Sequence, residues 1–103
     1  MKAVFLSFYQ AFYEEVVQVM DQQGIHGFTA WNSVTGRGSD DGEPHYGTHA
    51  WPTVNSAIIA FMEDAKVPEF LKAIHQLDLS AKQQGIRAFV LSAETYTDKS
   101  DFA

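Results

Sequence analysis

The six consecutive residues 57–62 are all apolar, and this short run constrains the fold more than any other segment of the chain. Because successive side chains of a strand point to opposite faces, such a run is apolar on both of its faces. Strands of this kind are typical of the middle of a sheet, where both faces are covered. The sequence therefore predicts a strand over residues 54–62 at the centre of a sheet rather than at its edge.

Three further strands are expected from alternation and composition. Residues 2–8 alternate, with Val4, Leu6 and Phe8 on one side. Residues 28–34 contain the β-formers Thr29, Trp31 and Val34, and residues 86–93 are expected to form the last strand.

Two amphipathic helices are expected between these strands. In the first, Tyr13, Val16, Val17 and Met20 follow the spacing of one helix face, and Gly24 provides its C-terminal stop. In the second, Pro68 falls in the first turn and Asp64 is expected to cap it. Its buried face is expected to comprise Val67, Phe70, Leu71, Ile74, Leu77 and Ala81.

The predicted order is βαββαβ, which is the ferredoxin-like α+β fold: a four-stranded antiparallel sheet with two helices on one face. We expect a single domain over residues 1–103, with a long loop at 35–53 and a polar tail at 94–103. The first and third strands are apolar on both faces, so the face without helices would expose apolar surface in a monomer. This pattern predicts an oligomer in which the uncovered faces pack together.

Composition excludes several classes of function. Acidic residues outnumber basic ones 13 to 7, for a net charge of −6, which argues against nucleic acid as a partner. The chain has no cysteine, so it can form no disulfide, thiolate metal site or thiol nucleophile. No segment approaches the length of a membrane span, and we expect a cytoplasmic protein without membrane insertion.

A family resemblance emerges from the order and spacing of these features. Glu14-Glu15-Val16-Val17, then Gly24-Ile25-His26-Gly27-Phe28-Thr29 and Gly36-Arg37-Gly38, resemble the corresponding segments of the nitrogen-regulatory PII signal proteins and their PII-like relatives. In that family the Gly-x-Gly leads into a long protruding loop, the T-loop. The resemblance covers nearly all of residues 1–93. Residues 81–87, however, lack the glycine-rich segment with which PII proteins hold nucleotide phosphates.

The resemblance implies a homotrimer that binds a small effector, with an adenine nucleotide as a candidate, in clefts between subunits at the base of the T-loop. Glycine lets the backbone approach a ligand closely, and arginine offers a fork of donors to a phosphate or carboxylate. The predicted effector-binding residues are Gly36, Arg37, Gly38, Lys82 and Arg87. A tight turn with solvated charges is the alternative interpretation of the same residues.

Loop residues suggest two other kinds of contact. Tyr46 and Trp51 could stack on a partner or pin the loop to the body of the protein. His45 and His49 lie close to acidic residues, so they could bind a divalent transition metal. Asn32 and Asn55 could hold the loop base by hydrogen bonds or could face solvent.

The sequence thus favours a PII-like regulatory protein that controls a partner, such as a transporter or an enzyme, through its loop. A metal-responsive protein that uses His45 and His49 is the first alternative. A small enzyme is the second, and we predict no catalytic residues because no nucleophile motif or phosphate-cradling loop is present.

Overall fold

The computed structural model describes residues 1–36, 44, 46–47, 54–80 and 85–97. Along this part of the chain the elements are β1 Lys2–Tyr9, η1 Gln10–Phe12, α1 Tyr13–Gln22, β2 Phe28–Val34, β3 Asn55–Met62, η2 Asp64–Lys66, α2 Val67–Ser80 and β4 Ile86–Ser92. The predicted order βαββαβ is confirmed, and the strand bounds differ from the predicted ones by no more than a single residue at each end.

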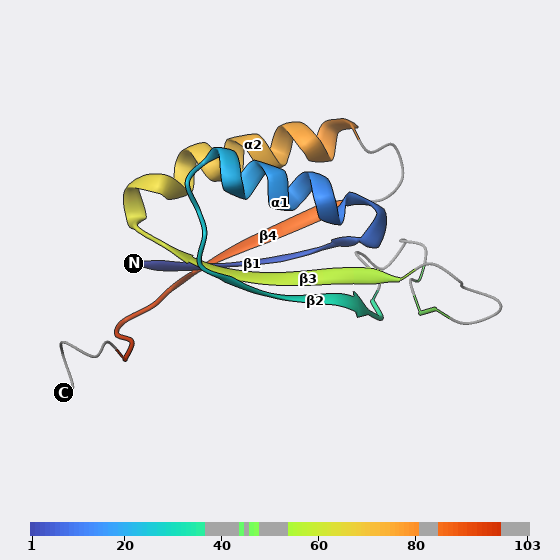
Figure 1. The fold of residues 1–103 in the computed structure, drawn as a ribbon, viewed down its shortest axis with the longest axis horizontal. Coiled ribbons are helices and arrows are strands. Elements are labelled where there is room, and N and C mark those ends of the chain that lie inside the picture. The colour runs from blue at the N-terminus through green and yellow to red at the C-terminus, as the bar shows by residue number, and fades with distance from the viewer. Residues whose placement is uncertain (37–43, 45, 48–53, 81–84, 98–103) are drawn as a thin grey trace.

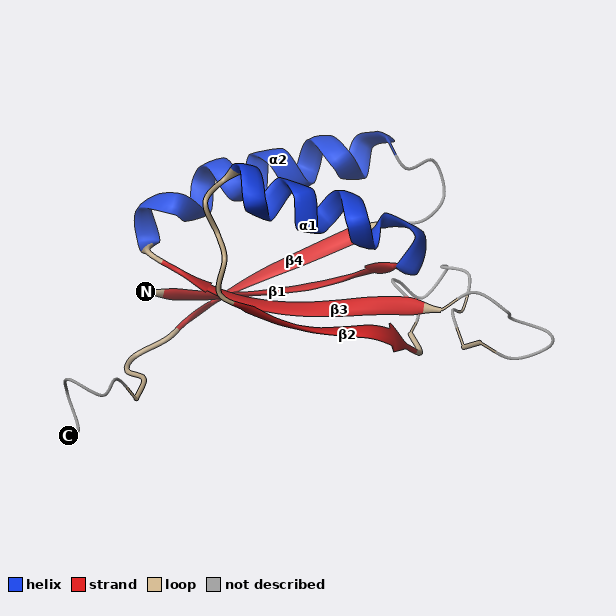
Figure 2. Cartoon of the chain, in the orientation of Figure 1, coloured by secondary structure: helices blue, strands red, loops and turns tan. Residues whose placement is uncertain are grey.

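The four strands form one sheet in the order β2-β3-β1-β4, and every neighbouring pair is antiparallel. Strand β3 lies inside the sheet, as its apolar composition predicts. Both helices cover the same face, with α1 on the β2 side and α2 on the β4 side (Figures 1 and 2). This is the predicted ferredoxin-like arrangement.

The core lies between the sheet and the two helices. Its largest fully buried apolar side chains are Val4, Leu6, Phe8, Val16, Met20, Ile58 and Phe70. Val4 and Leu6 of β1 are buried in the core together with residues of both helices, so this side of β1 faces the helices. Their partners Ala60 and Ile58 in β3 lie on the same face, because opposite residues of paired strands share a face. Burying each large apolar side chain stabilises the fold by about 1.5–3 kcal/mol.

The end of α1 shows how the sequence sets a helix boundary. Gly24 has a φ of 71°, the left-handed conformation that glycine adopts without steric cost. Its N–H donates to the Asp21 carbonyl (3.1 Å), and the N–H of Ile25 donates to the Met20 carbonyl (2.8 Å). These two bonds form a Schellman motif and direct the chain toward β2. The predicted stop at Gly24 is confirmed.

The second helix begins differently from the prediction. Asp64 does not precede the helix as a cap but lies inside the 3-10 helix η2, which runs directly into α2. Its carboxylate accepts instead from the N-terminal amine of Met1 at 2.8 Å. Phe70 and Ile74 are buried as predicted, whereas Ala81 lies outside the described residues.

Different segments of the chain lie at the two ends of the sheet. The end of β2 and the beginnings of β3 and β4 lie at one end, together with the turn from β1 into α1 (Figure 1). The N-terminus and the end of β4 lie at the other. Residues 94–97 form neither helix nor strand. In the described residues no helix has the length and apolar character needed to cross a membrane.

Candidate functional site

A β-bulge marks the point where β2 leads into the long loop. Trp31 is opposite Ala57, whereas Val34 is opposite Asn55, so the two residues Asn32 and Ser33 face Ser56 alone. A bulge bends its strand and increases its twist, and bulges are frequent beside functional sites. The bulge therefore redirects the chain just before the predicted Gly36-Arg37-Gly38 segment.

Three elements meet at the carbonyl of the bulged residue Asn32. The hydroxyl of Ser56 donates to this oxygen at 2.6 Å, and the Nε2 of Gln10 donates to it at 2.8 Å. Ser56 is fully buried, so loss of this bond would leave a polar group unpaired away from water. The bonds join β3 and η1 to β2 at the bulge and hold the outgoing limb of the loop in place.

Gly36 and Asn55 are in close contact at the same place. Asn55 is buried, and a Cβ added to Gly36 would lie 2.7 Å from its Nδ2 atom. This separation is shorter than any ordinary contact, so a side chain at position 36 would displace the asparagine. The interpretation that Asn55 faces solvent is wrong, because Asn55 is buried.

The returning limb of the loop is also tied to the body. Tyr46 forms an isolated antiparallel bridge with Val54, and the Val54 carbonyl accepts from the N–H of Gln10 at 3.0 Å. Gly47 has a φ of 69°, and a Cβ there would lie 2.7 Å from Val54 Cγ1. Tyr46, predicted as a loop contact for a partner, is therefore placed at the base of the loop and is partly exposed.

Arg87 lies at the start of β4, opposite Ser7 of β1, and is exposed. It helps to line a pocket of about 240 Å³ between α2 and β4. The carboxylate of Asp78 lines this pocket too, and it accepts from the N–H of Ile86 at 2.8 Å.

Gly36 and Arg87 are not brought together within one chain. β2 and β4 are the two outer strands of the sheet, so three strand spacings, roughly 14 Å, separate them. A site shared between two copies of the chain, as the resemblance predicts, would not need one effector to span this distance.

The remaining predicted site residues lie outside the described part of the chain. They are Arg37, Gly38, His45, His49, Trp51 and Lys82. Within residues 1–36, 44, 46–47, 54–80 and 85–97, no group of three or more metal-ligating side chains comes together.

Two residues of the loop base were not singled out from the sequence. Ser56 lies beside an apolar run, and Gln10 follows the first strand. Neither belongs to a motif. A polar residue inside a strand predicted to be central is the one signal that Ser56 offers, since buried hydroxyls almost always have hydrogen-bond partners.

The face of the sheet opposite the helices carries large exposed apolar side chains. Trp31, Phe61, Phe89 and Leu91 are 49%, 48%, 55% and 53% exposed. The strand register places all four on this face, together with Phe5 and Ile59. The prediction that the uncovered face is apolar is confirmed.

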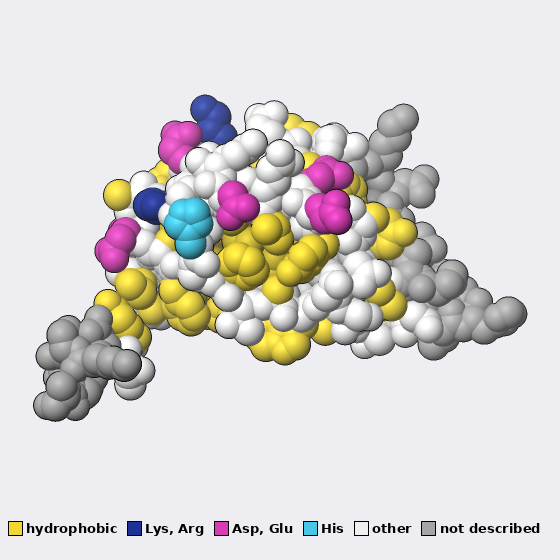
Figure 3. All heavy atoms as spheres, viewed as in Figure 1, with side chains coloured by type: hydrophobic (Ala, Val, Ile, Leu, Met, Phe, Trp, Pro, Cys, Tyr) yellow, Lys and Arg dark blue, Asp and Glu magenta, His cyan; other side chains and the backbone are white. Residues whose placement is uncertain are grey.

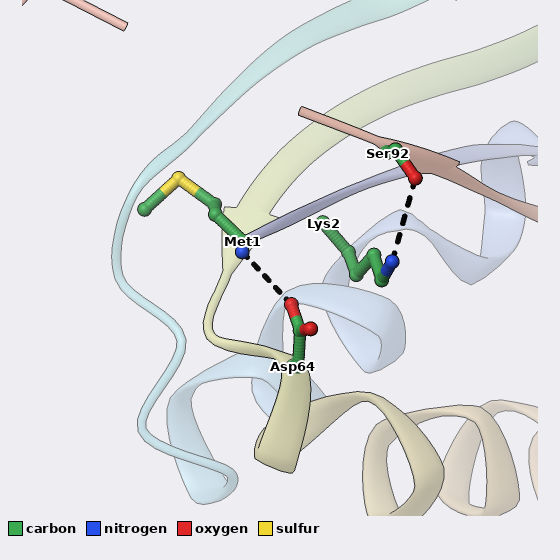
Figure 4. A network of polar contacts seen from close by, with 4 residues as sticks. All are labelled: Met1, Lys2, Asp64 and Ser92. Atoms are coloured by element: carbon green, nitrogen blue, oxygen red, sulfur yellow. Dashed lines mark hydrogen bonds and ion pairs between the residues drawn. The ribbon is translucent and has the colours of Figure 1, made fainter. Parts of the chain in front are cut away.

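A small polar network lies at the end of the sheet away from the loop (Figure 4). The N-terminal amine pairs with Asp64, and Lys2 Nζ donates to Ser92 Oγ at 3.4 Å. The hydrogen bond from the amine lowers the pKa of the Asp64 carboxyl below its usual value of 3.8, and the nearby positive charge of Lys2 contributes. This network connects the start of β1 with η2 and β4.

No known protein-family profile matches this sequence. No curated protein matches it either.

The fold, in contrast, matches solved structures along most of the chain. CPII of Thiomonas intermedia K12, a nitrogen regulatory PII-like protein bound to ADP, AMP and bicarbonate, aligns with a TM-score of 0.67 and 17% identity, over 87% of this chain and 84% of CPII. A protein of Thermus thermophilus described as a putative PII-like signalling protein aligns with a TM-score of 0.65 and 14% identity, over 87% and 83% of the two chains. The chain has the fold of PII-like proteins, as its sequence motifs indicate.

Proposed function

We propose that this protein is a PII-like regulatory protein. It binds a small anionic effector, with an adenine nucleotide as the first candidate, at the base of the loop and controls a partner through that loop. The observation that carries this proposal is the fixed loop base, where the Asn32 carbonyl receives two hydrogen bonds and Gly36 packs on Asn55. Structures of CPII with ADP, AMP and bicarbonate support the choice of effector.

The loop base provides the two parts that such a site needs. Gly36 packs against the buried amide of Asn55, and Arg37 and Gly38 follow it immediately in the sequence. A rigid base with a cation at the next position suits an anionic ligand, because charge-assisted hydrogen bonds are about twice as strong as neutral ones. An effector that prefers one arrangement of residues 37–53 would shift the loop toward that arrangement.

The proposal includes a homotrimer. The apolar face of the sheet is the surface that association would bury, and a shared site would use Gly36 of one copy and Arg87 of another. In this arrangement Lys82 and Arg87 are the candidate cations at the α2–β4 junction. We place the protein in the cytoplasm and give it a regulatory rather than a catalytic role, with a transporter or an enzyme as its partner.

Isothermal titration calorimetry with ADP, AMP, ATP and bicarbonate tests this proposal. The informative variant is Arg37→Ala, and Lys72→Ala is its matched control, because Lys72 is an exposed cation on α2. Loss of a charge-assisted bond should weaken nucleotide binding about tenfold or more, whereas the control should stay within about twofold. Absence of binding by all four compounds would refute the effector proposal, and equal affinities of the two variants would show that the site is wrong.

The metal-responsive alternative stays a prediction, because His45 and His49 lie outside the described residues. The same titrations with zinc, nickel and copper, repeated on a His45→Ala, His49→Ala double variant, would decide it.

A further inference from the structure

Gln10 contacts both limbs of the long loop at its base. Its backbone N–H donates to the carbonyl of Val54 on the returning limb at 3.0 Å. Its side-chain Nε2 donates to the carbonyl of Asn32 on the outgoing limb at 2.8 Å. One residue outside the loop therefore links the two limbs through two separate groups.

The backbone of Gln10 is held at both of its polar groups. β1 pairs with β3 as far as Tyr9 and Asn55, and the bond from Gln10 to Val54 extends this pairing by one position. The Gln10 carbonyl accepts from the N–H of Tyr13, which follows η1. The side-chain amide is thus presented from a backbone that the fold keeps in place.

The side chain of Gln10 joins two strands that are not neighbours. In the order β2-β3-β1-β4, β3 lies between β1 and β2, so two strand spacings, roughly 10 Å, separate β1 from β2 in the regular sheet. Gln10 follows β1 directly, and Asn32 lies in the bulge of β2. The bond is therefore a contact across the end of β3, distinct from the bond that Ser56 of β3 donates to the same carbonyl.

The donor is a neutral amide in a part of the chain without cations. Residues 3–36 contain no lysine and no arginine. On the face shown in Figure 3, the Lys and Arg side chains lie toward the end of the sheet that holds the N-terminus, whereas acidic side chains also lie toward the other end. Glutamine can hold the Asn32 carbonyl without pairing with an anionic effector, as lysine or arginine would.

We propose that Gln10 is the positioning residue that couples the two limbs of the loop. This role rests on the proposed function: a change that an effector causes at residues 32–36 is transmitted through Gln10 to Tyr46, Gly47 and Val54 on the returning limb. Without the side-chain bond, the two limbs respond separately, and the effector stabilises the outgoing limb alone. Coupling of this kind also strengthens effector binding, because linkage between two sites is reciprocal.

The informative variant is Gln10→Met, which removes the donor and keeps the charge and the approximate length of the side chain. Its matched control is Gln22→Met, because Gln22 is exposed at the end of α1, far from the loop base (Figure 1). Both variants are measured in the native assembly.

Two results are expected. Without effector, Gln10→Met should speed amide hydrogen exchange about fivefold at Val34 on the outgoing limb and at Tyr46 on the returning limb, as for the loss of one neutral hydrogen bond. In calorimetry with whichever of ADP, AMP, ATP and bicarbonate the parent binds best, its affinity should fall about fivefold. The control should stay within about twofold of the parent in both measurements.

The two measurements separate this inference from the proposed function. Faster exchange at one limb alone, or equal exchange in the two variants, would overturn the coupling. An unchanged effector affinity would overturn the positioning role even if exchange is faster at both limbs. If the parent binds none of the four compounds, the proposed function fails, and the exchange measurement still decides whether Gln10 couples the limbs.

Discussion

Replacing Phe89 by glutamate should separate the copies of this protein. Phe89 lies on the face of β4 opposite the helices, and 55% of its surface is exposed in the single chain. It pairs with Phe5 of β1, so it belongs to the apolar face that we expect to be buried in the oligomer. A charge at this position cannot be buried without a partner.

The magnitude follows from the exposed area. An aromatic side chain buries about 150–250 Å², so the exposed half of Phe89 corresponds to roughly 100 Å². At about 25 cal/mol per Å², its burial contributes about 2.5 kcal/mol for each copy. Phe89→Glu loses this term and adds the cost of burying a carboxylate, so the affinity between copies should fall by at least about 50-fold.

Sedimentation velocity across a range of micromolar concentrations measures this effect. Leu79→Glu is the matched control, because Leu79 is a large apolar residue that is 66% exposed on α2. The control should sediment as the parent does, whereas Phe89→Glu should sediment as a smaller species with unchanged far-ultraviolet circular dichroism. A parent that is monomeric at these concentrations, or a Phe89→Glu oligomer as stable as the control, would refute the reasoning.

Three further predictions concern the fold and the loop base. Ser56→Ala removes a buried donor to the Asn32 carbonyl, so it should lower the free energy of unfolding by about 1 kcal/mol in urea denaturation. Gly36→Ala places a Cβ 2.7 Å from Asn55 Nδ2, whereas Gly27→Ala meets nothing within 4 Å. The first should cost about 1–3 kcal/mol by the same measurement and the second less than about 0.5 kcal/mol. Asp64→Asn should destabilise the protein at neutral pH, because the carboxylate is the form that pairs with the N-terminal amine.

The pH dependence of the last prediction has a definite sign. The pKa of Asp64 is lowered in the folded protein from its usual value of 3.8, so the carboxylate stabilises the fold above that value. This contribution is lost as the pH falls through the lowered pKa. Nuclear magnetic resonance titration of the Asp64 carboxyl that gave a pKa at or above 3.8 would contradict the pairing.

Each of the other two predictions has its own contrary result. A Ser56→Ala variant as stable as the parent would mean that Gln10 alone satisfies the Asn32 carbonyl. Equal stabilities of Gly36→Ala and Gly27→Ala would mean that Asn55 moves away from position 36 at no cost.

Much of the fold could be predicted from local patterns. The alternation of residues 2–8, the doubly apolar run 57–62 and the spacing of Val16 and Met20 each depend on the period of one element, and each predicted element is present. Gly24 also acts locally, since its left-handed conformation is a property of one residue and its neighbours.

The arrangement of the candidate site was harder to predict from local sequence patterns. The sequence singled out Gly36 and Asn55, and the structure brings them together. The sequence could not show that Ser56 and Gln10 donate hydrogen bonds to the Asn32 carbonyl, because these residues are 24 and 22 positions from Asn32 along the chain. Their meeting depends on the strand order and on the bulge, which residue type alone does not specify.

The sequence by itself determined the types and order of the elements, the central place of β3 and the apolar character of the uncovered face. These depend on periodicity and on the hydrophobic effect, which act on short segments. Only the tertiary structure decided that Gly36 and Arg87 lie at opposite edges of one sheet, and that the Asn32 carbonyl accepts from both Ser56 and Gln10. Such relations between distant segments arise from strand pairing and packing, which join residues far apart in the sequence.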